Sequence, residues 1–453
     1  MRNSSSSQSV VGRAMRKFGF PLILVTAIML FSVSQGLAAP ASCASTSVAS
    51  QADLDAAIAA FNAETRACRH KITLTADITL ETPMTGINNN HDISHARLVI
   101  AGNHFSVEAP DDDTSIFSIG PKTHVIMEQI IISGARTNYD GAGIRNAGHL
   151  VLRKSTVSDN QGLYGGGIYN SGKLRLFRSS ISDNWSDEEG AGIYNEGNLT
   201  VIRSNIINNN TSGPSPGGGI YNTGRLTVSY STISNNGAVE EGGGIDNEGG
   251  TVIINNSTLD HNEAGLWGGG ISNFRGKVFI TNSTLSANKG YSHGGGGIGN
   301  SGTLTLTNST LSKNSSEEDG VGGIDNTGKL TLKNSIIANS KGGDCDNRYG
   351  DTMAAFFSLI EDSGEDACSL INGVRGNIIG VDPRLGKLKK NGGPTKTHAL
   401  LKRSRAINRG KNKLAVDVDG KRLKTDQRGK GHRRIFRKRV DIGAYEFSNR
   451  KLR

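Results

Sequence analysis

Short segments with alternating apolar and polar residues recur along the chain, and five of them share one pattern. The pattern runs apolar-x-apolar, then Ser, then an apolar residue, then Asn three residues later. Alternation with a period of two residues predicts β-strands, and Val, Ile and Thr favour strands. The five segments are LVLRKSTVSDN (150–160), LRLFRSSISDN (174–184), LTVSYSTISNN (226–236), VFITNSTLSAN (278–288) and LTLTNSTLSKN (304–314).

A glycine-rich octet precedes these segments, of which GGGIYNSG (165–172) is one copy. The asparagines of the octets recur every 24 to 27 residues, at Asn146, Asn170, Asn195, Asn222, Asn247, Asn273, Asn300 and Asn326. A unit of about 25 residues with three short strands cannot bury its own apolar face, so each copy must stack on the next, with strands about 4.8 Å apart. The sequence therefore predicts an all-β fold, a parallel β-helix with one repeat per coil and roughly 11–13 coils.

Each octet position has a structural interpretation in such a coil. Glycine supplies left-handed backbone angles at a corner, Asn closes the turn, and stacked asparagines form an amide ladder. The inward column is Ile144, Ile168, Ile193, Ile220, Ile245, Ile271, Ile298 and Ile324. The outward column is Arg145, Tyr169, Tyr194, Tyr221, Asp246, Ser272, Gly299 and Asp325.

The pattern also divides the chain into regions. Residues 71–340 form the predicted β-helix, with irregular early coils before the regular repeats of 141–340. Residues 39–70, with the helix-like stretch 51–67, are predicted to cap the open N-terminal strand edge, and residues 341–453 form a separate C-terminal module.

Residues 1–38 have the features of a secretory signal peptide. Arg13, Arg16 and Lys17 precede an apolar run (18–33), and small residues allow cleavage after Ala38. We therefore expect a protein that is secreted or held at the cell envelope, in the periplasm or on the outer surface, with no transmembrane segment after cleavage.

Four cysteines form two pairs that are local in sequence. In an oxidising compartment this arrangement indicates the disulfides Cys43–Cys68 and Cys345–Cys368, although four cysteines allow three pairings. Metal binding is the weaker interpretation because neither pair has close ligand spacing or a paired histidine motif.

Two resemblances to known families follow from the motifs. The GGGI and I/LxxN blocks over about residues 140–340 resemble the repeats of polymorphic outer membrane proteins, which implies a right-handed, single-stranded parallel β-helix of the pectate-lyase-like superfamily. The blocks GVDPRLG (380–386), NGGPTKTHALL (391–401), TDQRGKG (425–431) and VDIGAYE (440–446) resemble the choice-of-anchor Q module of secreted bacterial proteins. The usual PGSPAIDAG block of that module is here KRSRAINRG (402–410), which is far more basic.

Charge is divided unevenly between the two parts of the chain. Residues 1–380 carry 27 Lys and Arg against 35 Asp and Glu, whereas residues 381–453, the basic tail, carry 24 against six. A surplus of +18 attracts anionic polymers such as lipopolysaccharide, acidic glycans or nucleic acid without reading sequence. In the tail, His398 is expected to be structural, and Asp382, Asp426, Arg428, Asp441 and Glu446 to make internal salt bridges or turn contacts.

The candidate ligand-binding residues lie on the coil surface. The column Tyr169, Tyr194, Tyr221 and Asp246 is expected either to stack on sugars or to shield the glycine corner by packing. Variable connections between the repeat blocks would add either a binding edge or ordinary solvated loops. The residues proposed for that edge are Trp185, Trp267, Tyr164, Tyr291, His293, Glu188, Glu189, Glu240 and Glu241.

No motif in the sequence identifies a catalytic site. The GHG and RIK blocks of polygalacturonase-like enzymes and the WxDH-type blocks of pectate lyases are missing, and the only Asp run, DDD (111–113), lies in an irregular early coil. Fold alone does not settle function. The acidic pairs of the loops could admit Ca²⁺, but no oxygen-ligand spacing supports such a site, so no cofactor is expected. We therefore expect a non-enzymatic, adhesin-like protein that binds polysaccharide or cell-surface glycan; the alternatives are a polysaccharide lyase or glycoside hydrolase and a structural envelope protein.

Overall fold

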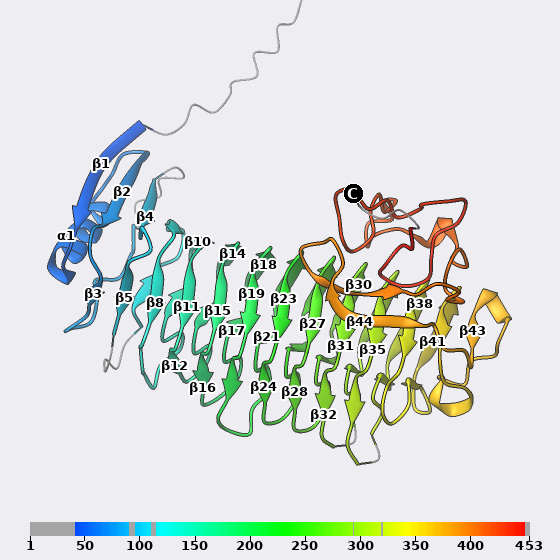
Figure 1. The fold of residues 1–453 in the computed structure, drawn as a ribbon. Coiled ribbons are helices and arrows are strands. Elements are labelled where there is room, and N and C mark those ends of the chain that lie inside the picture. Colours follow the sequence, from blue (N-terminus) through cyan, green and yellow to red (C-terminus); the bar gives the residue numbers. More distant parts are fainter. Residues whose placement is uncertain (1–40, 90–95, 110–114, 293, 319, 449–453) are drawn as a thin grey trace, which may run out of the picture. The chain divides into compact units, whose positions relative to one another are not determined.

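The computed structural model describes residues 41–89, 96–109, 115–292, 294–318 and 320–448. The expected signal peptide (1–38) and His293 lie outside these ranges. Within them, the chain winds through stacked coils whose strands form four parallel sheets, A to D, running along the stack (Figure 1). In the described part of the chain, no helix is long and apolar enough to cross a membrane.

Sheet A is the first and longest strand segment of each coil, and it contains 13 strands. Its strands are β1 (Ala41–Val48), β2 (Cys68–Leu74), β4 (Arg97–Ala101), β7 (His124–Glu128), β10 (His149–Arg153), β14 (Lys173–Phe177), β18 (Asn198–Ile202), β22 (Arg225–Ser229), β26 (Thr251–Asn255), β30 (Lys277–Thr281), β34 (Thr303–Thr307), β38 (Lys329–Lys333) and β41 (Thr352–Phe356).

Sheet B follows sheet A in each coil after a sharp corner, and it also contains 13 strands. Its strands are β3 (Ile78–Thr79), β5 (Ser106–Glu108), β8 (Ile131–Ser133), β11 (Thr156–Ser158), β15 (Ser180–Ser182), β19 (Asn205–Ile207), β23 (Thr232–Ser234), β27 (Thr258–Asp260), β31 (Thr284–Ser286), β35 (Thr310–Ser312), β39 (Ile336–Ala338), β42 (Leu359–Ile360) and β43 (Ile378–Ile379).

Sheet C contains ten strands, eight of which hold the Ile-x-Asn part of an octet. Its strands are β6 (Phe117–Ile119), β9 (Ile144–Asn146), β13 (Ile168–Asn170), β17 (Ile193–Asn195), β21 (Ile220–Asn222), β25 (Ile245–Glu248), β29 (Ile271–Phe274), β33 (Ile298–Asn300), β37 (Ile324–Asn326) and β40 (Cys345–Asp346).

Sheet D was not expected from the sequence. Its seven two-residue strands give the regular coils a fourth strand where only a variable connection was predicted. The residues after the repeated Asn of each second motif pair with the next coil before the loops diverge. They are β12 (Gln161–Gly162), β16 (Trp185–Ser186), β20 (Asn210–Thr211), β24 (Gly237–Ala238), β28 (Glu263–Ala264), β32 (Lys289–Gly290) and β36 (Ser315–Ser316).

Inward columns of like residues form the core. The eight octet isoleucines are fully buried. The octet asparagines form the predicted amide ladder, in which Asn146 Nδ2 donates to Asn170 Oδ1 at 2.6 Å and Asn170 Nδ2 to Asn195 Oδ1 at 2.7 Å. A second ladder begins with Asn160 Nδ2 and Asn184 Oδ1, 3.0 Å apart. These bonds satisfy buried amides from coil to coil, so the register is specified by side chains as well as by the backbone.

Glycine is required at two neighbouring positions of the octet for two different physical reasons. Gly165 has a φ of +63°, in the left-handed region that favours glycine. The next residue, Gly166, has no such angle, but a Cβ there would lie 1.7 Å from the carbonyl oxygen of Trp185. The corner therefore needs glycine once for backbone angle and once for close approach of the next coil.

A helix and a disulfide close the N-terminal end. The helix α1 (Gln51–Asn62) begins at Ser50, whose Oγ accepts from the backbone N–H of Asp53. Its buried face is Leu54, Ile58 and Phe61, with Ala57. The strand β1 pairs with β2, and the predicted disulfide Cys43–Cys68 is present.

The coils continue past residue 340, where the sequence pattern placed the end of the β-helix. Strands β41 and β43 extend sheets A and B, and Ile379 lies in the last described strand of sheet B. The second predicted disulfide, Cys345–Cys368, is confirmed and joins β40 to the segment just after the short helix η1 (Gly364–Asp366). A further short helical turn, η2 (Val374–Gly376), precedes β43.

The basic tail then turns back along the outside of the coils (Figure 1). It contains an antiparallel pair, β44 (Leu385–Lys390) and β45 (Lys396–Leu400), and the short helix η3 (Asn412–Leu414). Hydrogen bonds connect it to the coils between β26 and β39; for example, Thr258 Oγ1 donates to the carbonyl oxygen of Lys396 at 2.7 Å.

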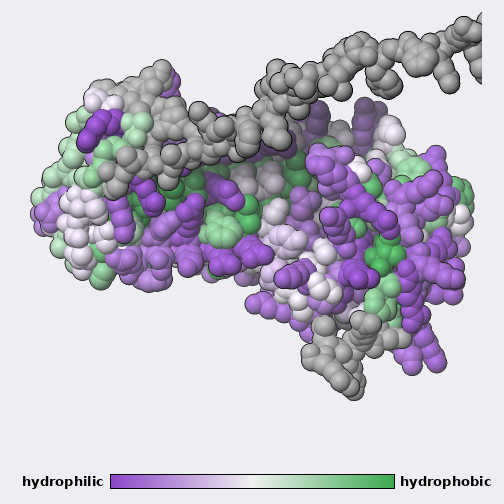
Figure 2. Space-filling model, turned by 90° about the horizontal axis from the view of Figure 1, so that it is seen from above, coloured by the Kyte–Doolittle hydropathy of each residue, from purple (hydrophilic) through white to green (hydrophobic). Residues whose placement is uncertain are grey.

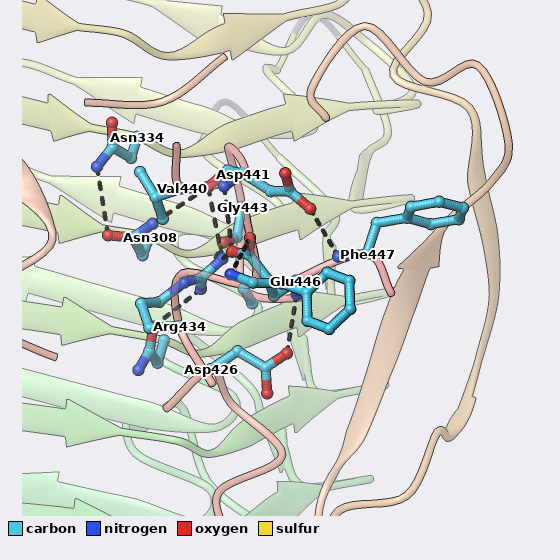
Figure 3. A network of polar contacts seen from close by, with 12 residues as sticks. Asn308, Asn334, Asp426, Arg434, Val440, Asp441, Gly443, Glu446 and Phe447 are labelled. Carbon is cyan, nitrogen blue, oxygen red and sulfur yellow. Dashed lines mark hydrogen bonds and ion pairs between the residues drawn. The ribbon is translucent and has the colours of Figure 1, made fainter. Parts of the chain in front are cut away.

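A polar network anchors the tail, as Figure 3 shows. The fully buried Arg434 donates from Nη2 to Glu446 Oε2 at 3.0 Å and from Nη1 to the Gly443 carbonyl oxygen at 3.0 Å. Arg428 and Asp426 form a second buried pair at 2.6 Å. Asp426, Arg428, Arg434, Asp441 and Glu446 are thus buried and hold the tail together. Asp382 is exposed and makes a turn contact, in which it accepts from the backbone N–H of Arg384 at 2.6 Å.

Candidate functional site

The expected tyrosine column lies on the outer face of sheet C. Tyr169 and Tyr194 stack with ring centroids 5.1 Å apart and planes 7° apart, and Tyr194 and Tyr221 stack at 5.0 Å. Tyr164 meets Tyr194 edge-on, and Arg145 lies 5.9 Å from the centre of the Tyr169 ring. The ring faces are therefore directed at one another along the stack, and the ring edges and hydroxyls point outward.

Carboxylates accept hydrogen bonds from the outer tyrosines of this column. Tyr169 Oη donates to Glu196 Oε2 at 2.8 Å, and Tyr221 Oη donates to Glu248 Oε2. Burial raises the pKa of Tyr194 to about 12, and it raises the pKa values of Tyr169 and Tyr221 together with the bonds to glutamate. These phenols stay neutral, as donors, over the physiological pH range.

A second column, formed by the residue before each octet, brings further acids to the same face. Gly165 N–H donates to the carbonyl oxygen of Glu189, and Gly217 N–H donates to that of Glu241, so Glu189 and Glu241 lie two coils apart in one column. Burial raises the pKa of both carboxyls. Burial also raises the pKa of Asp246 to about 7, against a hydrogen bond from Ser272.

The other loop residues do not all join this face. Glu188 Oε2 accepts from Ser215 Oγ at 3.2 Å, and the Glu240 N–H bonds to the Ser215 carbonyl oxygen. Trp185 lies in β16 of sheet D and is exposed, on a different face from the tyrosines.

Two more aromatic residues of the loop edge are held by polar partners. Trp267 packs over Gly294, where a Cβ would lie 1.6 Å from Trp267 Cδ1, and hydrogen-bonds Asp325. Tyr291 Oη donates to Glu263 Oε2 at 3.1 Å, and Lys289 Nζ lies 3.8 Å from the centre of its ring. The sequence-predicted residues thus divide into a packed acidic-aromatic face and a separate edge.

A groove that the sequence analysis missed lies on the outer face of sheet A. It has a volume of about 400 Å³ and crosses β4, β7, β10, β14 and β18. Apolar side chains, Ile126 and Val151, contribute to its floor, and its polar wall is basic. The basic residues are Arg97, His124, His149, Arg153, Lys173 and Arg175. Figure 2 shows apolar surface bordered by hydrophilic surface on the face seen from above.

The parallel register explains why these side chains line up. His124 pairs with His149, His149 pairs with Lys173, and Val151 pairs with Arg175. The two imidazole rings lie 4.3 Å apart. Burial and the charge of Lys173 lower the pKa of His149, so this imidazole is mainly neutral at pH 7 and gains charge in acid.

No carboxylate lines the groove among the residues that the structure places there. Glu128 lies beside it and pairs with Arg153, with Nη1 and Oε1 2.7 Å apart. Both partners are partly exposed, so this pair contributes little to stability and leaves the groove with a net positive field.

A second basic cavity of about 710 Å³ lies where the basic tail meets the coils. Arg178, Arg203 and Tyr230 line it from the corner between sheets A and B, and Lys390 and Lys430 line it from the tail. The four cationic side chains are exposed. Arg178 lies three residues after Arg175 of the groove, so the groove and this cavity share one coil.

The comparisons with known proteins bear on the fold. A family model described as a right handed beta helix region matches residues 87–259. The chain is a right-handed parallel β-helix. No curated protein matches the sequence significantly. The crystal structure of pectate lyase Pel9A has a TM-score of 0.43 and 14% sequence identity to this β-helix, over 90% of this chain and 98% of that chain.

Potential metal ligands gather at one place in the described part of the chain. One group of three or more His, Cys, Asp or Glu ligand atoms lies within 4.8 Å of one another there: Cys43, Glu64, Cys68 and His70, at the N-terminal cap. The loop glutamates that the sequence analysis considered for Ca²⁺ are not part of it.

Signals for the missed groove were present in the sequence. In HLVLR (149–153) and KLRLF (173–177), the polar positions of the alternating strands are His149, Arg153, Lys173 and Arg175. Aligning the strands by coil would have put these cations side by side. The cavity at the tail had no such signal, because Lys390 and Arg203 are 187 residues apart in sequence.

Proposed function

We propose that this protein is an extracellular or envelope-associated β-helix that binds an acidic polysaccharide without cleaving it. The observation that carries the proposal is the groove on sheet A, whose basic side chains repeat from coil to coil over an apolar floor. Two disulfides are typical of proteins in an oxidising compartment, which supports the location.

The repeat of the groove fits a polymer better than a small molecule. Its five strands span roughly 19 Å at about 4.8 Å per strand. A linear glycan along the coil axis would meet at least one basic side chain on four of the five coils, while the faces of its sugar rings would contact Ile126 and Val151. Lysine and arginine bind carboxylate and sulfate groups by charge-assisted hydrogen bonds.

The second cavity extends the same chemistry toward the basic tail. Arg178, Arg203, Lys390 and Lys430 offer four more cations, and the tail has the large positive balance noted above. An anionic chain that leaves the groove near Arg175 would continue into this cavity. The resemblance of the tail to a choice-of-anchor Q module is compatible with a role at a cell surface.

The composition of the groove favours binding over hydrolysis. Glycoside hydrolases use two carboxyl groups on opposite sides of the scissile bond, and the residues that line the groove provide none. Among the described residues, carboxyls with raised pKa values gather instead on sheet C, where Asp246 and Glu241 are neighbours. A hydrolase centred on Asp246 is therefore the rival function.

Binding of heparin and polygalacturonate to the full chain at several salt concentrations tests the proposal. We expect Lys173→Gln/Arg175→Gln to lower the affinity about tenfold and to reduce its salt dependence, since two of the charge-assisted contacts are lost. The matched control is Lys277→Gln/Lys329→Gln, which changes lysines in the same outer row of sheet A outside the groove. Equal loss in both variants would refute the groove as the binding site.

Incubation with uronate polysaccharides distinguishes the rival. The proposed binding protein releases neither unsaturated products nor reducing ends. Turnover that Asp246→Asn abolishes, with binding retained, would establish an enzyme on sheet C and overturn the non-enzymatic assignment. Reducing ends without unsaturated products would identify a hydrolase, and unsaturated products would identify a lyase.

A further inference from the structure

Four potential metal ligands converge at the N-terminal cap. Cys43, Glu64, Cys68 and His70 each offer one ligand atom, and these atoms lie within 4.8 Å of one another. Cys68 and His70 are buried, while Cys43 and Glu64 are partly buried. The group combines two sulfurs, one imidazole nitrogen and one carboxylate oxygen, the donor types that Zn²⁺ takes in proteins.

Local structure explains why these residues meet. Cys68 and His70 are two residues apart in β2, so their side chains point to the same face of the strand. Cys43 comes from β1, which pairs with β2, and Glu64 comes from the turn after α1. His70 Nε2 lies 3.2 Å from Glu64 Oε2, and the His70 ring also packs edge-on against Phe61.

The carboxylate is held in position by neighbours outside the group. Arg66 donates from Nη2 to Glu64 Oε2 and from Nε to Glu64 Oε1, both at 2.8 Å. The amide of Asn89 bonds the backbone carbonyl oxygen of Glu64 at 3.0 Å. Such supporting bonds orient a ligand and raise the affinity of metal sites in general.

The second disulfide has no such surroundings. In the described part of the chain, Cys345 and Cys368 are not joined by a His, Asp or Glu ligand atom at the same spacing. A disulfide needs only two cysteines of suitable geometry. The histidine and glutamate beside Cys43–Cys68 therefore need a separate explanation.

We propose that the cap has a second, reduced form in which Zn²⁺ replaces the Cys43–Cys68 disulfide. A dithiol reductant transfers two electrons and two protons, so that the S–S bond breaks, two thiols form and the dithiol becomes a disulfide. Binding of Zn²⁺ to the two thiolates, His70 and Glu64 then releases the two thiol protons. Four protein ligands make a closed, tetrahedral, structural site.

The exchange has a structural purpose at this position. Strand β1 is the edge strand of sheet A, and in this structure the disulfide ties it to β2. A zinc ion bound by Cys43 and Cys68 keeps the same connection after reduction. The cap would then cover the strand edge, which is an aggregation risk in β-solenoids, in both redox states.

Metal titration of the reduced full chain tests the inference. The protein is reduced with a phosphine, which does not bind the metal as a dithiol does, and titrated with Co²⁺ and then Zn²⁺. We expect one Co²⁺ per chain with thiolate-to-cobalt absorption, displacement by Zn²⁺, and no uptake before reduction. His70→Ala should weaken binding at least tenfold, and Cys43→Ser/Cys68→Ser should abolish it.

The control variant is Cys345→Ser/Cys368→Ser, which removes the other cysteine pair and should bind Co²⁺ like the wild type. Trypsin cleavage at Arg66, Arg69 and Lys71 measures whether the cap is folded. If reduction opens the cap, Zn²⁺ should slow this cleavage at least tenfold. Uptake that survives in Cys43→Ser/Cys68→Ser, or a reduced wild type that gains neither absorption nor protection, would overturn the inference.

Discussion

One backbone position has two different uses in the first and second halves of the β-helix. At the corner between sheets A and B, the residue after each sheet A strand from β7 to β41 has a left-handed φ of about 50°. In the open coils this residue is Lys154, Arg178, Arg203 or Tyr230. In the coils covered by the basic tail it is Asn256, Asn282, Asn308 or Asn334, which we call the corner asparagines.

The corner asparagines bind the tail by their side-chain amides. Asn256 Nδ2 donates to the Asp426 carbonyl oxygen at 2.9 Å, Asn282 Nδ2 to that of Thr425 at 2.9 Å, and Asn334 Nδ2 to that of Lys411 at 3.1 Å. Arg178 and Arg203 at the earlier corners instead line the basic cavity. The backbone conformation of the corner is the same in both regions. The side chain at the corner therefore decides whether a coil is covered by the tail or offers an anion-binding surface.

The largest expected effect comes from the buried anchor of the covered region. Arg434→Ala leaves Glu446 buried without its ion-pair partner, so we expect a loss of about 3–5 kcal/mol in the free energy of unfolding. Arg433→Ala is the control. Because the Arg433 side chain is exposed, its removal should change the free energy of unfolding by no more than about 0.5 kcal/mol. Urea unfolding measures both; equal values would show that the tail is not anchored at Arg434.

Glycine at the two kinds of corner compares them directly. Asn282→Gly removes the bonds to the Thr425 carbonyl oxygen and to Arg434, which should cost about 1–2 kcal/mol. Arg203→Gly has the same backbone consequences at the same φ without losing a docking bond, so it should be nearly neutral. Thermal melts at one pH provide the measurement, and a neutral Asn282→Gly would contradict the docking role of the corner asparagines.

Two histidines extend the comparison to pH. His398, in the tail strand β45, is buried against the coils, where its Nε2 lies 2.9 Å from Ser286 Oγ, and burial lowers its pKa. The unfolded chain therefore takes up this proton at a higher pH than the folded chain does. The stability contributed by neutral His398 is full above about pH 6.5 and falls as the pH drops below it.

We expect His398→Gln to make the melting temperature less dependent on pH between 7 and 5, measured against the exposed control His261→Gln. A wild-type slope that is unchanged in His398→Gln would show that other groups cause the acid sensitivity.

The smallest expected effect concerns His149 in the open groove. Its pKa is lowered by burial and by Lys173, so acid adds a positive charge to the groove as the pH falls below about 6.5. Heparin, whose sulfates stay ionised, should then bind severalfold more tightly at pH 5 than at pH 7. His149→Gln should reduce this gain, and isothermal titration at constant ionic strength measures it; an unaltered gain would locate the titrating group elsewhere.

The repeated positions could be predicted because they solve the same local problem in every coil. Each inward Ile, ladder Asn and corner Gly contacts the equivalent residue of the next coil. A residue that recurs at a fixed spacing in the sequence therefore recurs at a fixed spacing along the stack of coils. The outward tyrosines were placed correctly in one column, but the stacking of their rings on each other required side-chain geometry. The loop sequences do not repeat from coil to coil, so the positions of their side chains could not be predicted from the sequence.

The sequence by itself determined the coil, its apolar columns and the two cysteine pairs, because all of these depend on neighbours at fixed sequence distance. Only the tertiary structure decided where the basic tail lies, how Lys390 comes to face Arg203, and why Glu64 and His70 surround one disulfide. Such contacts join segments with no common period. They depend on side-chain shape, on burial and on the path by which the tail returns along the coils. None of these can be predicted from the spacing of residues in the sequence.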